Sequence, residues 1–264
     1  MNVALATSRV RPVQWASHVD WLREHLRPGE HISVIVSTGG GKSHLICRGL
    51  LQLPAIAHAR VLLVDDKGDD PVTREWGLPI QEYPLGVRAQ WAARELPPHY
   101  RLVVPDWTWS SSGTHESGVA KARLVVGRAL DAFYNEARNP ADPSAPDDAL
   151  ASVVVIDEAY ALTANRPPSL NLAPLVIRNW RKGRYRALTQ IALSQEPLWM
   201  PSEFYGQPSH LYLGRIQDKR QQDRLREIGG NTEVIAETVS RLDDHEFLFL
   251  GQKGKHMAVV KVGR

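Results

Sequence analysis

Short apolar runs alternate with longer amphipathic stretches along most of this 264-residue chain. The apolar runs have the length and the β-branched residues of buried strands. They lie at residues 32–36, 61–64, 101–107, 153–156 and 189–194. Stretches with helical spacing lie at 18–26, 44–53 and 120–137, and a further one begins near residue 173. Strands that alternate with helices predict an α/β fold, with a mainly parallel central sheet and helices on both of its faces.

The last part of the chain has a different order. A strand at 210–213 is followed by two helical stretches, at 217–228 and 234–242. A C-terminal β-hairpin is then predicted, in which residues 246–250 pair with 257–262 across the turn GQKGK.

The length of the chain suits one α/β domain with additions. We expect a helical lead-in at residues 1–30, a core at 31–200, and an extension at 201–264 that holds the last strand, two helices and the hairpin.

Three glycines separate the first strand from a helix in the segment VSTGGGKSH, residues 36–44. A strand, a glycine-rich loop, Lys-Ser and a helix are the context of a phosphate-binding loop, whose backbone N–H groups and helix N-terminus hold anions. Lys42 can reach the β- and γ-phosphates of a nucleotide, and the Ser43 hydroxyl can bind Mg²⁺. The alternative is a glycine-rich turn with a solvated lysine. The residues predicted to bind nucleotide are Ser37, Thr38, Gly39, Gly40, Gly41, Lys42, Ser43 and His44.

Val36 departs from the usual pattern of such a loop, which has a glycine at this position. A β-branched residue can belong to the end of the preceding strand. The tight part of the turn would then fall on residues 37–41.

Two acids, Asp157 and Glu158, follow the apolar run VVVI. A carboxylate at the tip of a strand beside a phosphate loop can bind Mg²⁺, and a second one can accept a proton from an attacking water. We therefore predict Asp157 as a metal ligand and Glu158 as a general base. A strand followed by a helix capped with two acids is the common alternative, but the glycine loop and the acid pair together favour nucleotide hydrolysis.

Gln195 ends another predicted strand, in the segment ALSQEP. Its amide can hydrogen-bond the γ-phosphate or the attacking water, and so report whether the phosphate is present. A glutamine at a strand end is more often simply solvated, so this prediction depends on the other two motifs.

Composition narrows the function classes only a little. The net charge is +3 and the isoelectric point is near 9.0, which permits contact with nucleic acid without arguing for it. Cys47 is the single cysteine, so no disulfide can form within the chain, which fits a reducing compartment. Charges or prolines interrupt every apolar run, and the N-terminus lacks the apolar core of a signal peptide. We expect a cytoplasmic protein with no membrane span and no structural zinc site.

Taken together, these motifs resemble the FtsK/HerA superfamily of DNA-pumping ATPases, which includes viral genome-packaging ATPases, chromosome and plasmid translocases and conjugation coupling proteins. The resemblance covers about residues 32–197 and is most specific in the Asp-x-Lys-Gly turn at 65–68 and the Ser-Gln-x-Pro segment at 194–197. It implies a RecA/ASCE-like P-loop NTPase that uses ATP and Mg²⁺. It also implies the same roles for Lys42, Ser43, Asp157, Glu158 and Gln195 as those given above.

The resemblance further implies a homo-oligomeric ring, a pentamer or hexamer, in which an arginine from one subunit completes the site of its neighbour. In the family this arginine lies about a dozen residues before the sensor glutamine, within the segment that reads WRKGRYR here. Arg184 fits this spacing best, and Arg181 and Arg186 are the alternatives. For most of these basic residues an ordinary solvated helix face is the simpler interpretation, and the remaining charges can track a DNA backbone.

The predicted function is an ATP-driven motor that moves double-stranded DNA independently of its sequence, packaging a viral genome while docked at a capsid vertex or portal protein. A plasmid or conjugative-element transfer ATPase and a filamentous-phage-assembly-like ATPase stay open. So do a nucleotide or metabolite kinase with an arginine-rich lid, and a nucleotide-binding scaffold that hydrolyses poorly. The acid pair and Gln195 favour water over a kinase substrate as the acceptor.

Overall fold

The computed structural model describes residues 10–57, 59–65, 81–82, 99–103, 115–137, 152–164, 169–195, 198, 200–251 and 254–263. A ten-stranded sheet crosses this part of the chain in the order β1-β10-β9-β8-β2-β7-β6-β3-β5-β4. From β8 to β4 all neighbours are parallel, whereas β8, β9 and β10 pair antiparallel. The predicted α/β fold with a mainly parallel sheet is confirmed. The strands are β1 (Pro12–Gln14), β2 (Ile32–Ile35), β3 (Arg60–Asp65), β4 (Gln81–Glu82), β5 (His99–Val103), β6 (Ser152–Ile156), β7 (Leu188–Ser194), β8 (His210–Leu213), β9 (Glu246–Gly251) and β10 (His256–Lys261).

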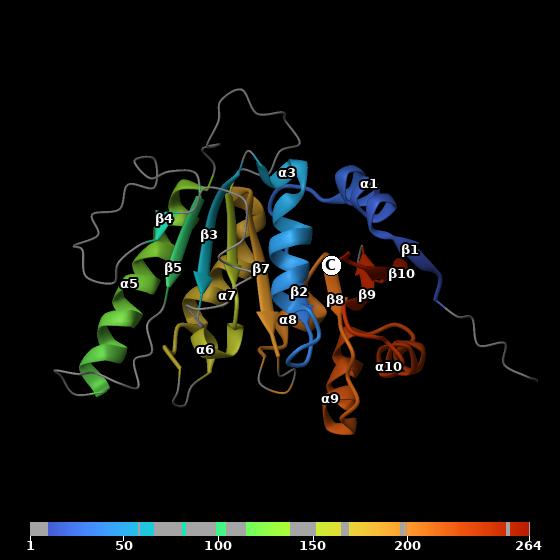
Figure 1. Ribbon diagram of the computed structural model, residues 1–264. Helices are drawn as coiled ribbons and strands as arrows, with labels where there is room; N and C mark the ends of the chain where they lie inside the picture. Colours follow the sequence, from blue (N-terminus) through green and yellow to red (C-terminus); the bar gives the residue numbers. More distant parts are fainter. Residues whose placement is uncertain are drawn as a thin grey trace, which may run out of the picture.

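Helices cover both faces of the sheet (Figure 1). Successive residues of a strand point to opposite faces, so Val34 packs with α1–α3 whereas its neighbour Ile35 packs with the later helices. Two hydrophobic clusters result, one on each face. The helices are α1 (Trp15–His25), α2 (Lys42–His44), α3 (Pro54–Ala57), α5 (His115–Glu136), α6 (Ala159–Thr163), α7 (Ala173–Lys182), α8 (Glu203–Gly206), α9 (Lys219–Arg224) and α10 (Thr232–Ser240).

The helix predicted at 44–53 is continuous but irregular. It begins as α2, continues as a π-helical turn over Leu45–Gly49 and ends as a 3-10 turn over Leu50–Gln52. A similar 3-10 turn, Leu225–Ile228, ends the helix predicted at 217–228. The hydrophobic spacing thus predicted where helical structure lies but not its exact winding.

The strand predicted at 101–107 begins two residues earlier than expected, since β5 starts at residue 99. The residues after 103 lie outside the described part. Several helices begin before the apolar spacing does: α10 begins at Thr232 because the Asn231 side chain accepts a hydrogen bond from the Val234 N–H (3.3 Å). The short elements β1, α6 and α8 were not predicted, since three to five residues carry too little periodicity.

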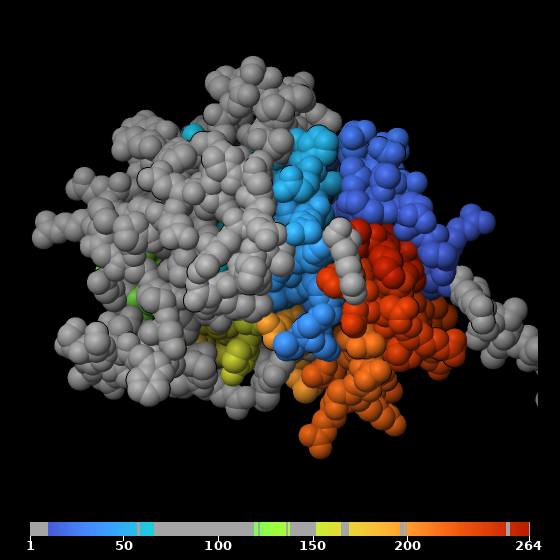
Figure 2. Space-filling view, in the orientation of Figure 1, coloured from blue at the N-terminus to red at the C-terminus, as the bar shows by residue number. Residues whose placement is uncertain are grey.

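Aromatic and imidazole rings hold α1 against the C-terminal strands, and the blue and red surfaces meet in Figure 2. His18 is buried and its Nε2 lies 2.7 Å from the Tyr212 hydroxyl oxygen. Burial lowers the pKa of His18 to about 3, so its ring is neutral at physiological pH. Trp21 stacks between His25 and His256, at ring separations of 4.3 and 4.5 Å. None of the described helices is long and apolar enough to span a bilayer.

Candidate functional site

The predicted site residues directly follow β2, β6 and β7, and they come together at the carboxyl ends of these strands. These three strands are parallel, and β7 lies between β2 and β6. Their carboxyl ends therefore bring together the glycine loop, the Asp157–Glu158 pair and Gln195. In open α/β sheets, the crevice at this edge is where ligands bind.

The contacts of Val36 show why a valine stands at the start of the glycine loop. Its N–H donates to the Ser194 carbonyl oxygen (3.0 Å), so it continues the pairing of β2 with β7 as expected. Its side chain is fully buried in the space left by two glycines, because a Cβ atom on Gly40 or Gly214 would lie 2.4 or 2.1 Å from the Val36 Cγ2. The turn itself falls on the following residues, where Gly39 and Gly41 have φ values of 80° and 93°.

This packing predicts a coupling between Val36 and Gly214. Gly214→Ala should destabilise the protein by about 1–3 kcal/mol, because its methyl group overlaps the valine side chain. Val36→Ala removes the Cγ2 atom, the nearer of the two overlapping side-chain atoms, and leaves the Cβ at 2.7 Å, so the double variant should lose less stability than the two single variants added together. Urea unfolding of the four proteins measures the coupling. Gly127→Ala is the matched control, since its Cβ would meet Leu172 and Leu175 at 3.6 and 3.9 Å, which are ordinary contacts. Strictly additive losses would show that the two residues do not share this space.

Lys42 joins the loop to the acid pair. Its Nζ donates to the Asp157 carbonyl oxygen (2.6 Å) and lies 3.4 Å from Asp157 Oδ1 and 3.5 Å from Glu158 Oε2. Only 5% of the Lys42 side chain is exposed, and a cation at such a position requires nearby acceptors. The structure thus brings together residues that are 115 positions apart in the chain.

Glu158 is held by the end of β7. Its Oε1 accepts a hydrogen bond from the Ser194 hydroxyl (2.9 Å), and its Oε2 accepts one from the Gln195 backbone N–H (3.2 Å). The Gln195 side chain in turn accepts from the Thr38 hydroxyl (2.7 Å). A continuous set of hydrogen bonds therefore links the glycine loop, Gln195 and the carboxylate. Sequence reasoning gave Ser194 no role of its own, although this serine begins the Ser-Gln-x-Pro segment and directly precedes Gln195.

Ser43 and Asp157 are the candidate magnesium ligands. Ser43 lies in the first turn of α2, and Asp157 directly follows β6. Mg²⁺ keeps several waters and takes one or two protein ligands together with phosphate oxygens, so a hydroxyl and one carboxylate are a sufficient protein contribution. The cation already present beside Asp157, the Lys42 ammonium, shows that this carboxylate lies where positive charge is accommodated.

The His44 side chain contacts the C-terminal part of the chain. Its Nε2 hydrogen-bonds the Gly263 carbonyl oxygen, and its ring meets that of His245 edge-on with centroids 5.0 Å apart. Because its side chain is engaged there, His44 can bind an anion only through its backbone N–H. The predicted Asp-x-Lys-Gly turn lies outside the described residues, apart from the buried Asp65 at the end of β3.

Arg184 lies at the opposite ends of these strands, beside their amino termini. A Cβ atom on Gly29 would lie 2.6 Å from the Arg184 Cα, which places Arg184 beside the amino-terminal end of β2. The seven residues of β7 separate this edge from Gln195, a distance of about 20 Å. Arg184 therefore does not belong to the cluster around Lys42 in its own chain.

The other arginines in this basic segment, and Arg178 just before it, have partners within the subunit. Arg178 and Arg186 lie over the Tyr134 ring, at 4.3 and 4.6 Å from its centroid. Arg181 donates to Glu203 Oε1 at 2.5 Å. Arg184 is exposed, and within the described part of the chain its guanidinium has no hydrogen-bonded or ion-paired partner.

No protein-family model matches the sequence, and no curated protein matches it significantly. Solved structures do match the fold. The DNA-packaging ATPase B204 from Sulfolobus turreted icosahedral virus superimposes with a TM-score of 0.63, over 90% of this chain and 100% of B204, at 13% sequence identity. The chain has the fold of a P-loop ATPase.

Two further solved structures are similar in fold to the chain. The genome-packaging NTPase B204 of Sulfolobus turreted icosahedral virus 2, in complex with AMPPCP, gives a TM-score of 0.58 at 14% identity and covers 90% of this chain and 100% of its own. VirB4 of Thermoanaerobacter pseudethanolicus gives 0.51 at 14% identity and covers 89% of both chains. The similarity thus extends over about nine tenths of the chain.

Proposed function

We propose that this protein is an ATPase whose hydrolytic site lies between the glycine loop and the ends of β6 and β7. The observation that carries the proposal is the contact of Lys42 with both Asp157 and Glu158. This contact joins a phosphate-binding lysine to a candidate metal ligand and a candidate base at the ligand-binding edge of a P-loop ATPase fold.

The chemistry follows from the positions of these groups. The ammonium group of Lys42 has three donors, so it can bind a phosphate oxygen while it still donates to the Asp157 carbonyl oxygen. Bound at Ser43 and Asp157, Mg²⁺ would neutralise charge that develops on the phosphates. Glu158 accepts a proton from the attacking water, and the products are ADP and phosphate. Gln195, bonded to Thr38 of the loop, senses the γ-phosphate at the same edge.

We further propose that hydrolysis drives the movement of double-stranded DNA, with genome packaging as the process and a ring of identical subunits, five or six, as the working form. The similarity in fold to viral DNA-packaging ATPases over their full length supports this role. The net charge of +3 is compatible with a DNA substrate. The capsid vertex would supply the docking site. A role in DNA transfer is the second candidate, since the sequence motifs are shared with transfer ATPases of the superfamily that the chain resembles.

The test of this proposal is ATP turnover with and without linear double-stranded DNA. We expect DNA to raise turnover irrespective of its sequence, and the effect to weaken steeply with salt, because phosphates rather than base edges are contacted. Lys42→Ala, which removes the phosphate-binding cation, is the background control. Turnover that ignores DNA, or a preference for one short sequence that survives high salt, would contradict a translocating motor.

A further inference from the structure

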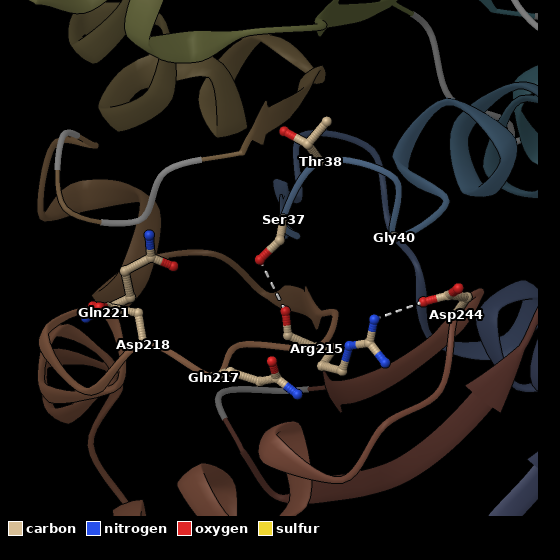
Figure 3. A pocket seen from close by; sticks show the side chains of 8 residues that line it. All are labelled: Ser37, Thr38, Gly40, Arg215, Gln217, Asp218, Gln221 and Asp244. Carbon is tan, nitrogen blue, oxygen red and sulfur yellow. Dashed lines mark hydrogen bonds and ion pairs between the residues drawn. The ribbon is translucent and has the colours of Figure 1, made fainter.

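A cavity of about 260 Å³ lies beside the glycine loop, between the loop and the C-terminal part of the chain (Figure 3). It opens on the β8 side of β2, whereas Lys42 and the acid pair lie toward β7 and β6 on the other side. The eight lining residues come from the glycine loop, the segment after β8 and the turn before β9. They are Ser37, Thr38, Gly40, Arg215, Gln217, Asp218, Gln221 and Asp244.

The lining is polar and carries two acids against one base. Arg215 Nη2 lies 3.1 Å from Asp244 Oδ1, and Asp218 Oδ1 accepts from the Gln221 backbone N–H (2.9 Å). Among the described residues no donor contacts the second oxygen of either carboxylate, so that oxygen can accept from a ligand. The excess of negative charge disfavours a phosphate group in the cavity and suits a neutral group that can donate hydrogen bonds.

The acid at position 244 is fixed relative to the loop. The next residue, His245, has a φ of 62°, and a Cβ atom on Gly41 would lie 2.7 Å from its Nδ1. On the other side, the Ser37 hydroxyl donates to the Arg215 carbonyl oxygen (3.0 Å), the bond that is drawn in Figure 3. The loop and the cavity wall are thus joined at two places.

We infer that this cavity holds the nucleoside half of the nucleotide, with the ribose hydroxyls donating to Asp244. The inference rests on the proposed function, since the phosphates would lie at Lys42 and the rest of the nucleotide would extend toward β8. Carboxylates recognise ribose hydroxyls because they accept both bonds at once.

The same lining specifies little about the base. Each of the side-chain amides of Gln217 and Gln221 can both donate and accept, so either purine edge can be satisfied. None of the eight lining residues is aromatic, so the cavity offers no ring on which a particular base would stack. Adenine and guanine nucleotides should therefore bind about equally.

Calorimetric titration of the full chain with ADP, 2′,3′-dideoxy-ADP, GDP and pyrophosphate tests the inference. ADP should bind at least about tenfold tighter than dideoxy-ADP, the expected loss when hydrogen bonds to a charged group are removed. GDP should bind within a few-fold of ADP. Asp244→Asn should remove most of the discrimination between ADP and dideoxy-ADP, whereas Asp243→Asn, which makes the same charge change one residue outside the lining, should keep it.

The wild-type ratio decides the inference even if Asp244→Asn does not fold. Equal binding of ADP and dideoxy-ADP, or ADP binding no tighter than pyrophosphate, would overturn the ribose assignment while leaving a phosphate site at Lys42. Failure of ADP and pyrophosphate alike to bind would refute the proposed ATPase itself. A discrimination that persists unchanged in a folded Asp244→Asn protein would move the ribose contact away from Asp244.

Discussion

Glu158→Gln is expected to bind ATP and Mg²⁺ but to lose nearly all turnover. The substitution removes the proton acceptor and leaves Asp157 in place, and loss of a general base costs about 10²- to 10⁴-fold in rate. The glutamine oxygen can still accept from the Ser194 hydroxyl or the Gln195 N–H, so the local fold should persist. Single-turnover hydrolysis and equilibrium ATP binding, measured side by side, separate the two effects.

Two further variants make this result specific. Lys42→Ala should weaken ATP binding itself, because its ammonium is the cation of the loop. Glu233→Gln, an exposed acid in the first turn of α10, makes the same chemical change far from the site and should leave turnover unchanged. Turnover of Glu158→Gln within a few-fold of the wild-type rate would refute the assignment of the base.

The parts of the site that the sequence predicted are those carried by short contiguous motifs. The end of a strand is indicated by a glycine loop before a helix, and also by an acid pair after an apolar run. Parallel strands bring their carboxyl ends to the same side of the sheet. Gln195 follows from the same argument, and the structure places it beside Glu158.

The contacts that complete the site connect distant segments, so no local pattern reveals them. Gly214 leaves room for Val36 although the two are far apart in sequence, and the positions of Asp244 and His245 follow from the pairing of β9 with β8. Ser194 was overlooked because a serine in a strand usually signals only polarity. Partner choice at these positions depends on tertiary packing, which periodicity does not encode.

The basic segment shows both what the sequence could predict and what it could not. Its helix was predicted to begin near Ala173, where α7 does begin, but sequence could not separate its arginines. The structure separates them by their partners: Arg186 lies over Tyr134 and Arg181 pairs with Glu203, while Arg184 is exposed at the ends of the strands opposite the glycine loop. Arg184 lies too far from Lys42 to act at the site of its own chain, so a role in hydrolysis would require a neighbouring subunit, as in the proposed ring.

Arg184→Ala is therefore expected to abolish turnover in the assembled ring, although every group of its own site is intact. A guanidinium supplied by a neighbouring subunit stabilises charge on the γ-phosphate and is worth about 10³- to 10⁵-fold in comparable systems. Arg184→Lys should also be impaired, because an ammonium lacks the planar pair of donors. Arg181→Ala is the control within the same segment, since its guanidinium is already bonded to Glu203.

Mixing two inactive proteins provides the decisive measurement. An Arg184→Ala subunit keeps its own Lys42 and Glu158, whereas a Glu158→Gln subunit keeps its own Arg184. In mixed rings, some junctions place an intact Arg184 against an intact Glu158, and turnover should partly return. Mixed rings that demonstrably form but stay inactive would exclude action between subunits by Arg184, as would an Arg184→Ala protein that is active as a monomer. If Arg181→Ala were inactive in place of Arg184→Ala, the role would pass to Arg181, whose bond to Glu203 would then have to break when the ring assembles.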